Sequence, residues 1–316
     1  MDAQAVRFAY ARAAKMSILA SLTARLKERD WIRRLYFSAA AQRSVAALRY
    51  ALMTSSSEKE EWRRRTADVL ASPDNADIPR AADAGRIIHG SLVMHNEIRI
   101  RPGSYYGYPL LRLLLRNRGV HEPQEEKVFQ EVLEFVPAGG SMLELGAYWG
   151  FYSLWFSRKI EGASCWLVEP NARALDWGRE NFALNGLPAR FVHGYVGAAP
   201  GTADDGTPIV DVDGLLGENA IRHLDVLHSD IQGAELDMLL GADRLLREKR
   251  VSYVFISTHS RELHERCKAH LVERDYLLVA SHSPAESFSV DGLIVARSPA
   301  TEGPAHVSIS TRVASS

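Results

Sequence analysis

Two glycines and two carboxylates are spaced as a ligand-binding turn requires. Glu144-Leu-Gly146-Ala-Tyr-Trp-Gly150 follows one apolar segment, and Glu169 ends the next, in WLVEPN. Gly146 allows a sharp turn out of a strand and Gly150 lets a helix approach closely, so the backbone between them can lie against a ligand. Glu169 is placed to accept hydrogen bonds from the two hydroxyls of a ribose. The alternative is a turn without a ligand, in which Glu169 only caps the next helix.

A second polar group, Asp230-Ile-Gln-Gly233-Ala-Glu235, follows a later apolar segment. Asp230 is predicted to face both the reactive end of a bound cofactor and an incoming nucleophile. Gly233 permits a tight turn, and Glu235 on the first turn of the following helix is predicted to point back toward the cleft. The structural alternative for Glu235 is a dipole interaction of under about 1 kcal/mol. We expect Asp230 and Glu235 to be catalytic.

Two histidines are candidates for a general base. Transfer to a hydroxyl needs a group near the acceptor oxygen that takes its proton, and the ordinary pKa of histidine suits that task near neutral pH. His259 ends a predicted strand, where ligands bind, and His121 opens the HEPQEE segment. Either residue could instead be structural, and His228 and His282 are expected to fill the sheet. We expect no metal, because no close acidic grouping matches a magnesium site.

Strands and helices that alternate from Ser141 onward must position these residues. This rhythm predicts an α/β fold with parallel central strands. The last two strands are joined by only SPAESFSVD, so they should pair antiparallel. This layout, a mostly parallel seven-stranded sheet closed by an antiparallel hairpin, is the class I methyltransferase (Rossmann-like) fold. The predicted strands are 141–146, 164–170, 189–197, 225–233, 253–259, 276–283 and 292–297, and the helices between them are 150–159, 171–185, 234–248 and 261–273.

The glycine loop favours a methyl donor over a dinucleotide. A dinucleotide fingerprint needs a third, central glycine so that a pyrophosphate can sit on the helix end. Tyr148 stands there instead and Trp149 adds bulk, whereas S-adenosyl-L-methionine carries no phosphate and tolerates such a loop. NAD is therefore much less favoured than S-adenosyl-L-methionine as the cofactor. The residues expected to bind the cofactor are Glu144, Gly146, Ala147, Tyr148, Gly150, Glu169, Asn171 and Asp230.

The Asp-x-x-Gly-x-Glu string at 230–235 resembles the signature of the FkbM-type methyltransferase family. The resemblance extends through ELGAYWGFYSLWF, WLVEPN, Asn185-Gly186 and VDVDGLL, and upstream through MHN, GSYYG and HEPQEE, so it covers roughly residues 92–297. It implies dependence on S-adenosylmethionine and, mostly, methylation of oxygen in polyketide tailoring and in glycan or lipopolysaccharide decoration. Two residues depart from the pattern: Tyr148 where many relatives have Asn, and Glu97 where a hairpin turn would favour Gly.

The first 80 residues are predicted to form a helical N-terminal extension, with amphipathic helices over 2–28 and 31–53 and a third helix ending near Leu70. Residues 81–120 are expected to form a hairpin at Asn96-Glu97 and a connecting segment, 121–300 the catalytic domain and 301–316 a flexible tail. Residues 1–70 carry 14 Lys and Arg against 7 Asp and Glu, and the remainder 24 against 32. This basic arm could contact an anionic partner, although solvated helix faces explain it as well.

The composition is that of an ordinary globular protein with no apolar run long enough for a membrane-spanning helix. The two cysteines, Cys165 and Cys267, are far apart in sequence, which favours free thiols in a reducing, cytoplasmic compartment. The N-terminal helices could mediate homo-oligomerisation. A group of aromatic residues could stack on an acceptor or pack the hairpin onto the core, and the sequence favours neither role over the other. These residues are Tyr105, Tyr106, Tyr108, Trp149 and Tyr152.

The sequence thus predicts an O-methyltransferase for a hydroxyl of a small-molecule or glycan acceptor. A nucleic-acid methyltransferase is the first alternative, but the Asn/Asp-Pro-Pro-aromatic string of base-amine methylation is replaced by Ser229-Asp230-Ile231-Gln232. We therefore expect no nucleic-acid partner. A non-catalytic cofactor-binding module is the second alternative, and the intact Glu169, Asp230 and Glu235 oppose it.

Overall fold

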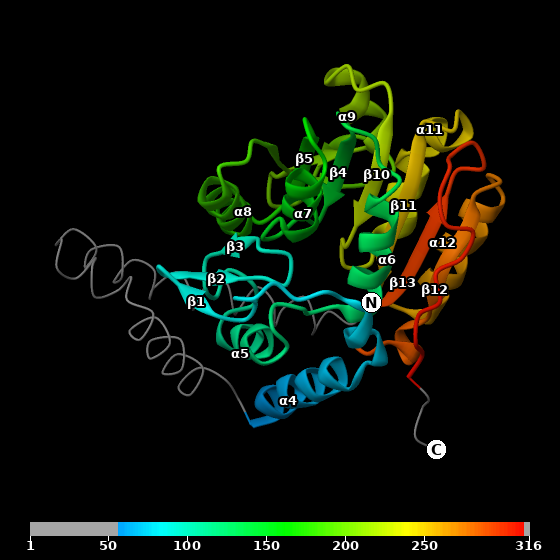
Figure 1. The fold of residues 1–316 in the computed structure, drawn as a ribbon. Coiled ribbons are helices and arrows are strands. Elements are labelled where there is room, and N and C mark those ends of the chain that lie inside the picture. Colours follow the sequence, from blue (N-terminus) through cyan, green and yellow to red (C-terminus); the bar gives the residue numbers. More distant parts are fainter. Residues whose placement is uncertain (1–55, 313–316) are drawn as a thin grey trace, which may run out of the picture.

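A twisted seven-stranded sheet forms the centre of the protein (Figure 1). The computed structural model describes residues 56–312. The strand order is β12-β13-β11-β10-β4-β5-β6, and β13 is antiparallel to both of its neighbours. The predicted class I methyltransferase fold, with its closing antiparallel hairpin, is confirmed. The strands are β4 (Ser141–Leu145), β5 (Ser164–Glu169), β6 (Arg190–His193), β10 (Leu224–Ser229), β11 (Val251–Thr258), β12 (Leu277–His282) and β13 (Gly292–Arg297).

Helices cover both faces of this sheet, so the central strand β11 is buried along its whole length. In β11, Tyr253 and Phe255 pack into one apolar cluster while Val254 and Ile256 pack into the other, because successive side chains of a strand point to opposite faces. The first cluster includes residues of α6 (Pro123–Leu133), α7 (Phe151–Lys159) and α8 (Ala172–Asn185). The second includes residues of α9 (Val212–Glu218), α10 (Glu235–Gly241), α11 (Asp243–Arg247) and α12 (Arg261–Val272).

The structure subdivides two predicted elements and adds others. The helix predicted over 234–248 is two helices, α10 and α11, that meet at Ala242. The strand predicted over 189–197 is divided at Gly194 into β6 and β7 (Tyr195–Val196); β7 joins β8 (Gly201–Thr202) and β9 (Pro208–Val210) in a separate small sheet. Helices α9 and α5 (Tyr108–Arg116) had not been predicted as helices.

The N-terminal segment packs beside the carboxyl edge of the large sheet. The third predicted helix is present as α4 (Ser56–Ala71), whereas the helices predicted over 2–28 and 31–53 lie outside the described residues. A short helical turn (η1, Pro73–Asp77) leads into a small sheet of β1 (Ile87–Ile88), β2 (Ser91–Val93) and β3 (Arg99–Ile100). The small sheet is fastened to α8, since the backbone N–H groups of Arg99 and Arg101 donate to the side chains of Asn185 and Asn181.

The predicted hairpin at Asn96-Glu97 joins β2 to β3, which pair antiparallel. Glu97 has a φ of 67°, whereas Asn96 does not have a positive φ, so the turn is not of the type I′ that would require both. The Asn96 side chain instead accepts a hydrogen bond from the Ile98 N–H and stabilises the turn locally.

Residues 301–312 pack against the body, which differs from the flexible tail expected from residue 301. Val307 is buried and its N–H donates to the carbonyl of Val279 in β12. The Ser310 N–H donates to Asp74, and the Ser310 carbonyl accepts from the Gln124 side chain. The tail therefore connects η1 to α6. None of the helices in the described range 56–312 is long and apolar enough to cross a membrane.

Candidate functional site

The loop after β4 is shaped by glycines at two positions. Gly146 has a φ of 71°, and a Cβ atom there would lie 1.8 Å from the backbone oxygen of Asp230. Gly150 has a φ of 74°, and a Cβ atom there would lie 2.9 Å from the Leu167 side chain. Tyr148, between them, also has a positive φ, of 46°. Asn tolerates this left-handed conformation better than most residues, so the Asn that the family resemblance implies here would suit the same backbone.

Glu169, at the end of β5, is held by the backbone of this loop. One carboxylate oxygen accepts from the Tyr148 N–H at 3.0 Å and the other from the Asn171 N–H at 2.8 Å. Asn171 is the residue that caps α8, because its side chain accepts from the N–H groups of Arg173 and Ala174. Glu169 is therefore not needed as a helix cap. Burial raises the pKa of Glu169 to about 7, although the two N–H donors oppose that change.

Glu144 and Ala147 hold the loop from behind. The Glu144 carboxylate is buried and accepts from the Ser153 N–H in α7 at 3.0 Å. The N–H groups of Gly146 and Ala147 both donate to the carbonyl of Val168 in β5. Glu144 thus ties the loop that follows β4 to α7, and Ala147 ties it to β5. The Glu144 side chain points into the protein rather than across the loop.

Asp230, Glu235 and His259 come together at the carboxyl edge of β10 and β11. The His259 Nδ1 atom is hydrogen-bonded to Glu235 at 2.8 Å, and its Nε2 atom lies 3.3 Å from Asp230. Glu235 is fully buried and also accepts from the Gly233 N–H. The structure thereby brings together three of the four predicted catalytic residues.

Asp291 completes this cluster and was not predicted from the sequence. Its carboxylate lies 3.3 Å from the Nε2 atom of His259, on the same nitrogen as Asp230. The sheet register explains the contact, since Thr258 of β11 pairs with Gly292 of β13. An antiparallel strand begins at the edge where its parallel neighbours end, so the Asp291-Gly292 pair before the last strand was the available signal.

The cluster shifts the pKa values of its members in opposite directions. Burial disfavours the charged form of His259, but the carboxylates of Asp230 and Glu235 outweigh it and raise its pKa to about 10. Burial also opposes ionisation of Asp230, yet the hydrogen bond and charge of His259 lower its pKa overall. Burial and the charge of Asp230 raise the pKa of Asp291 to about 6. Near neutral pH the His259 ring is therefore an imidazolium.

His121 lies in a neighbouring buried network and does not contact His259. Its Nδ1 atom is 2.7 Å from Glu126, and its Nε2 atom is 3.4 Å from Glu122. Burial works against the charged ring, but these two glutamates raise the pKa of His121. Its neighbour Glu122 is closer to the cleft, where it accepts from the hydroxyls of Tyr105 and Tyr152.

The other two histidines considered are buried at the sheet. His228 is hydrogen-bonded to Glu125 of α6 at 2.7 Å, and the Nδ1 atom of His282 lies 3.2 Å from the carbonyl of Ser283. Within residues 56–312, no group of His, Cys, Asp and Glu is arranged to hold a metal ion.

Three of the candidate aromatic residues have a packing role. Trp149, Tyr105 and Tyr152 are buried, and the Trp149 ring stacks on Tyr105 with centroids 4.6 Å apart. Tyr106 is exposed, with its ring 5.0 Å from Tyr148 and 5.9 Å from Trp62 of α4. Tyr106 is thus the exposed member of this aromatic group.

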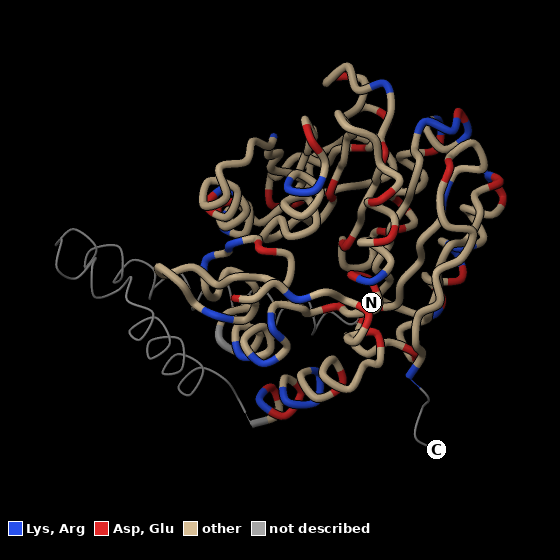
Figure 2. The backbone as a smooth tube through the Cα atoms, viewed as in Figure 1, with Lys and Arg blue, Asp and Glu red and all other residues tan. Residues whose placement is uncertain are grey.

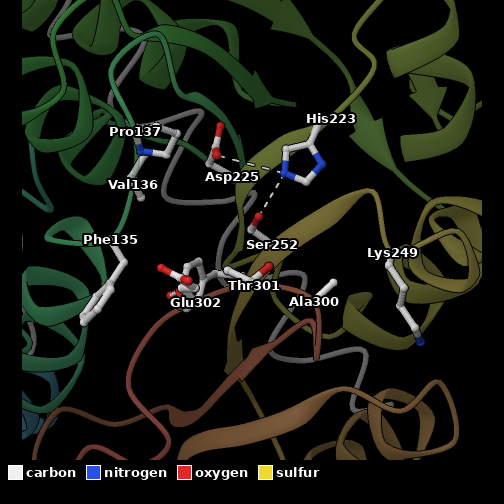
Figure 3. Close-up of a pocket in the computed structure, with 11 residues that line it drawn as sticks. Phe135, Val136, Pro137, His223, Asp225, Lys249, Ser252, Ala300, Thr301 and Glu302 are labelled. Atoms are coloured by element: carbon white, nitrogen blue, oxygen red, sulfur yellow. Dashed lines mark hydrogen bonds and ion pairs between the residues drawn. The ribbon is translucent and has the colours of Figure 1, made fainter.

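A hollow of about 320 Å³ lies at the opposite, amino edge of the sheet (Figure 3). It contains His223, Asp225 and Ser252, but the same Nε2 atom of His223 lies 2.9 Å from Ser252 and 4.0 Å from Asp225. A catalytic triad needs the serine and the acid on different ring nitrogens. This hollow therefore lacks that machinery, and it contains none of the predicted site residues.

Comparison with known proteins supports the class that the fold suggests. Residues 207–283 match the model of the methyltransferase FkbM domain. This confirms the family resemblance over a span that contains Asp230, Glu235 and His259 but not the glycine loop, Glu169 or Asp291. No curated protein matches the chain.

Solved structures similar to this chain include three methyltransferases of low identity. Precorrin-6y C5,15-methyltransferase from Geobacter metallireducens is 15% identical with a TM-score of 0.39, covering 55% of this chain and 87% of its own. TrmK from M. capricolum with S-adenosyl-homocysteine is 11% identical with a TM-score of 0.40, covering 55% of this chain and 69% of its own. Aeropyrum pernix fibrillarin with S-adenosyl-L-methionine is 16% identical with a TM-score of 0.37, covering 51% of this chain and 68% of its own.

The chain therefore has the class I methyltransferase fold, and its residues 207–283 are similar to the methyltransferase FkbM domain. The methyl donor that this family implies is S-adenosylmethionine. The chain fits that donor, because the loop from Gly146 to Gly150 leaves no room for side chains at its two ends and Glu169 offers a carboxylate beside it.

Proposed function

We propose that the protein transfers the methyl group of S-adenosylmethionine to a hydroxyl oxygen of a glycan, a lipid-linked sugar or a natural product. The observation that carries this proposal is the cluster of Asp230, Asp291 and His259 at the carboxyl edge of the sheet. This edge is where doubly wound folds bind ligands. The cluster lies next to the glycine loop, since Gly146 is packed against the backbone of Asp230.

The residues of the loop would bind and orient the cofactor. Glu169 would accept hydrogen bonds from the ribose hydroxyls, supported by the N–H groups of Tyr148 and Asn171. Gly146 and Gly150 would let the backbone approach it, with Glu144 and Ala147 fixing the loop. When bound, the cofactor supplies an electrophilic methyl group on a sulfonium. Asp230 would face that positive charge from the neighbouring strand.

The acidic character of the acceptor side favours a hydroxyl-bearing acceptor over a nucleic acid. Asp230 lies close enough to Asp291 and Glu122 to raise the pKa of both, and carboxylates accept hydrogen bonds from hydroxyls while repelling phosphates. The basic arm that suggested nucleic acid falls largely in residues 1–55. Helix α4 carries acidic as well as basic residues (Figure 2). Catalysis would come mainly from holding the acceptor oxygen in line with the methyl group.

We also propose that the protein works in the cytoplasm. Both Cys165 and Cys267 are free and buried, as expected of thiols in a reducing compartment. The suggested oligomerisation through the first two helices concerns residues outside the described range and stays a prediction.

The proposed function is tested by turnover with isotopically labelled S-adenosylmethionine across sugars, lipid-linked sugars, phenolic and polyketide acceptors, RNA and DNA. Mass spectrometry of extracts from cells with and without the protein would identify the natural product of the reaction. Label on a hydroxyl oxygen supports the proposal. Label on a nucleobase, or binding of NAD instead of S-adenosylmethionine in calorimetry, contradicts it.

A further inference from the structure

We propose that Asp291 takes the proton of the acceptor hydroxyl, and that His259 is a positioning residue rather than the base. This inference rests on the proposed function and assigns the proton acceptor within the same site. It begins from the register that pairs Thr258 with Gly292, which sets Asp291 beside His259 at the edge where Asp230 also ends its strand.

Three carboxylates lie within 3.3 Å of the His259 ring and favour its charged form, in which neither nitrogen can accept a proton. Its Nδ1 atom donates to Glu235, whose carboxylate is fully buried and is itself fixed by the Gly233 N–H. Its Nε2 atom lies 3.3 Å from both Asp230 and Asp291. Carboxylates on both sides of the ring stabilise the imidazolium, and a base must have a free lone pair aimed at the acceptor.

The other carboxylates of the cleft are less suited to this task than Asp291. Glu235 is fully buried behind the ring. Glu122 already interacts with two tyrosine hydroxyls and lies 3.7 Å from Arg65. Asp230 accepts from the Gln232 side chain as well as facing His259, and its pKa is lowered.

Asp291 combines an accessible carboxylate with a suitable affinity for protons. Its side chain is 20% exposed, and His259 is the one polar partner that the described residues offer it within contact distance. Burial, followed by the charges of Asp230 and Glu125, raises its pKa to about 6, although His259 and Arg65 act in the opposite direction. At neutral pH it is therefore mostly ionised yet more basic than an ordinary aspartate.

In the resulting step the acceptor oxygen forms a bond to the methyl carbon while its proton moves to a carboxylate oxygen of Asp291. The carbon–sulfur bond breaks with its electron pair left on sulfur, which becomes a neutral thioether. Asp291 then returns the proton to water. His259 keeps its charge throughout and holds Asp291 and Asp230 in place.

The test uses Asp291→Asn and Asp291→Glu, with Asp204→Asn as a control because Asp204 is exposed in the loop between β8 and β9. In ¹⁵N NMR of labelled histidine, the parent His259 should remain an imidazolium from pH 6 to above pH 8, and Asp291→Asn should lower its pKa. Turnover of the best acceptor should fall by about 10²–10⁴ in Asp291→Asn with unchanged cofactor affinity. Asp291→Glu should restore part of the lost turnover, and added formate should restore part of the turnover of Asp291→Ala.

Two results would overturn the inference: a His259 ring that is neutral at pH 7 in the parent, or an Asp291→Asn variant that turns over within a few fold of it. Both differ from failure of the proposed function, which shows as a parent without affinity for S-adenosylmethionine. The NMR measurement needs no acceptor, so it decides the charge of His259 in either case.

Discussion

The backbone oxygen of Asp230 fills the space that a Cβ atom of Gly146 would occupy, at a distance of 1.8 Å. The turn that would receive the cofactor is therefore packed directly against the strand end that presents the acceptor-side carboxylate. Any residue other than glycine at position 146 must move one of these two parts away from the other.

Gly146→Ala should accordingly reduce both stability and cofactor affinity. The left-handed φ costs about 1–2 kcal/mol for a residue with a Cβ atom, and displacing the Asp230 backbone adds a similar amount or more. Gly206→Ala is the matched control, because Gly206 has a φ of 83° with open space around it. Urea unfolding and calorimetry with S-adenosylmethionine should show a loss of about 3 kcal/mol or more for the first variant and only the strain cost for the second. Equal losses would mean that the contact with Asp230 is unimportant.

Glu169→Ala should weaken cofactor binding by about 1.5–3 kcal/mol, since charge-assisted hydrogen bonds to the ribose would be lost. The parent's affinity should also fall as the pH drops below about 7, because burial raises the pKa of this carboxyl to that value and the protonated form accepts fewer hydrogen bonds. Glu161→Ala, an exposed change on the same domain, should leave affinity and its pH dependence unchanged. Calorimetry between pH 5.5 and 8.5 measures both effects, and a flat profile for the parent would argue against ribose binding by Glu169.

Two truncations should distinguish the contribution of residues 1–55 from that of α4. Removing residues 1–55 should leave cofactor affinity within a few fold. Removing residues 1–75 should destabilise the domain, because it deletes the contacts of Asp74 with Lys127 and Ser310 and of Arg65 with Tyr105. Thermal unfolding and calorimetry on both truncated proteins distinguish the two segments. If the longer deletion is as stable as the shorter, these contacts of Asp74 and Arg65 do not contribute to the stability of the domain.

Much of the catalytic domain could be predicted because its elements follow local rules. Most strands and helices follow hydrophobic periodicity and end near their predicted positions, although β6 and β10 end four residues earlier than predicted. The register of β13, by contrast, depends on pairing between distant segments. Asp291 was missed for that reason, although the antiparallel direction predicted for its strand already placed its start at the ligand-binding edge. The charge of His259 could not be read from the sequence either, since it depends on three carboxylates from different segments meeting at one ring.

Glu126→Gln should cost about 3–5 kcal/mol of stability, because this buried carboxylate accepts from the N–H groups of His121 and Glu122 and lies 2.9 Å from His95. Burial opposes its ionisation, but His121 and His95 lower its pKa, so its contribution is present above 4.5 and lost as pH falls through the folded value. The raised pKa of His121 gives stability that is complete below 6.5 and lost as pH rises through its folded value. The difference in the free energy of unfolding between parent and variant should therefore be greatest between pH 4.5 and pH 6.5.

Urea unfolding from pH 3 to 9 measures this difference. Glu134→Gln is the control, an exposed glutamate paired with Lys159 that should cost no more than about 1 kcal/mol. A parent whose advantage over Glu126→Gln does not change with pH would contradict the ionic interpretation of the network.

Glu235→Gln should leave cofactor affinity unchanged, lower turnover by about 10² or more and reduce the pKa of His259. Glu235 accepts from His259 at 2.8 Å and is fully buried, so the amide would remove the charge that keeps the ring protonated from its inner side.

Glu262→Gln is a close control, since Glu262 is also an acid in the first turn of a helix but is exposed. A dipole role alone predicts losses of under about 1 kcal/mol in both variants and ordinary rates. Steady-state kinetics, ¹⁵N NMR of His259 and thermal unfolding on the pair distinguish the two roles: a Glu235→Gln variant that matches Glu262→Gln in all three measurements would leave Glu235 with the dipole role alone.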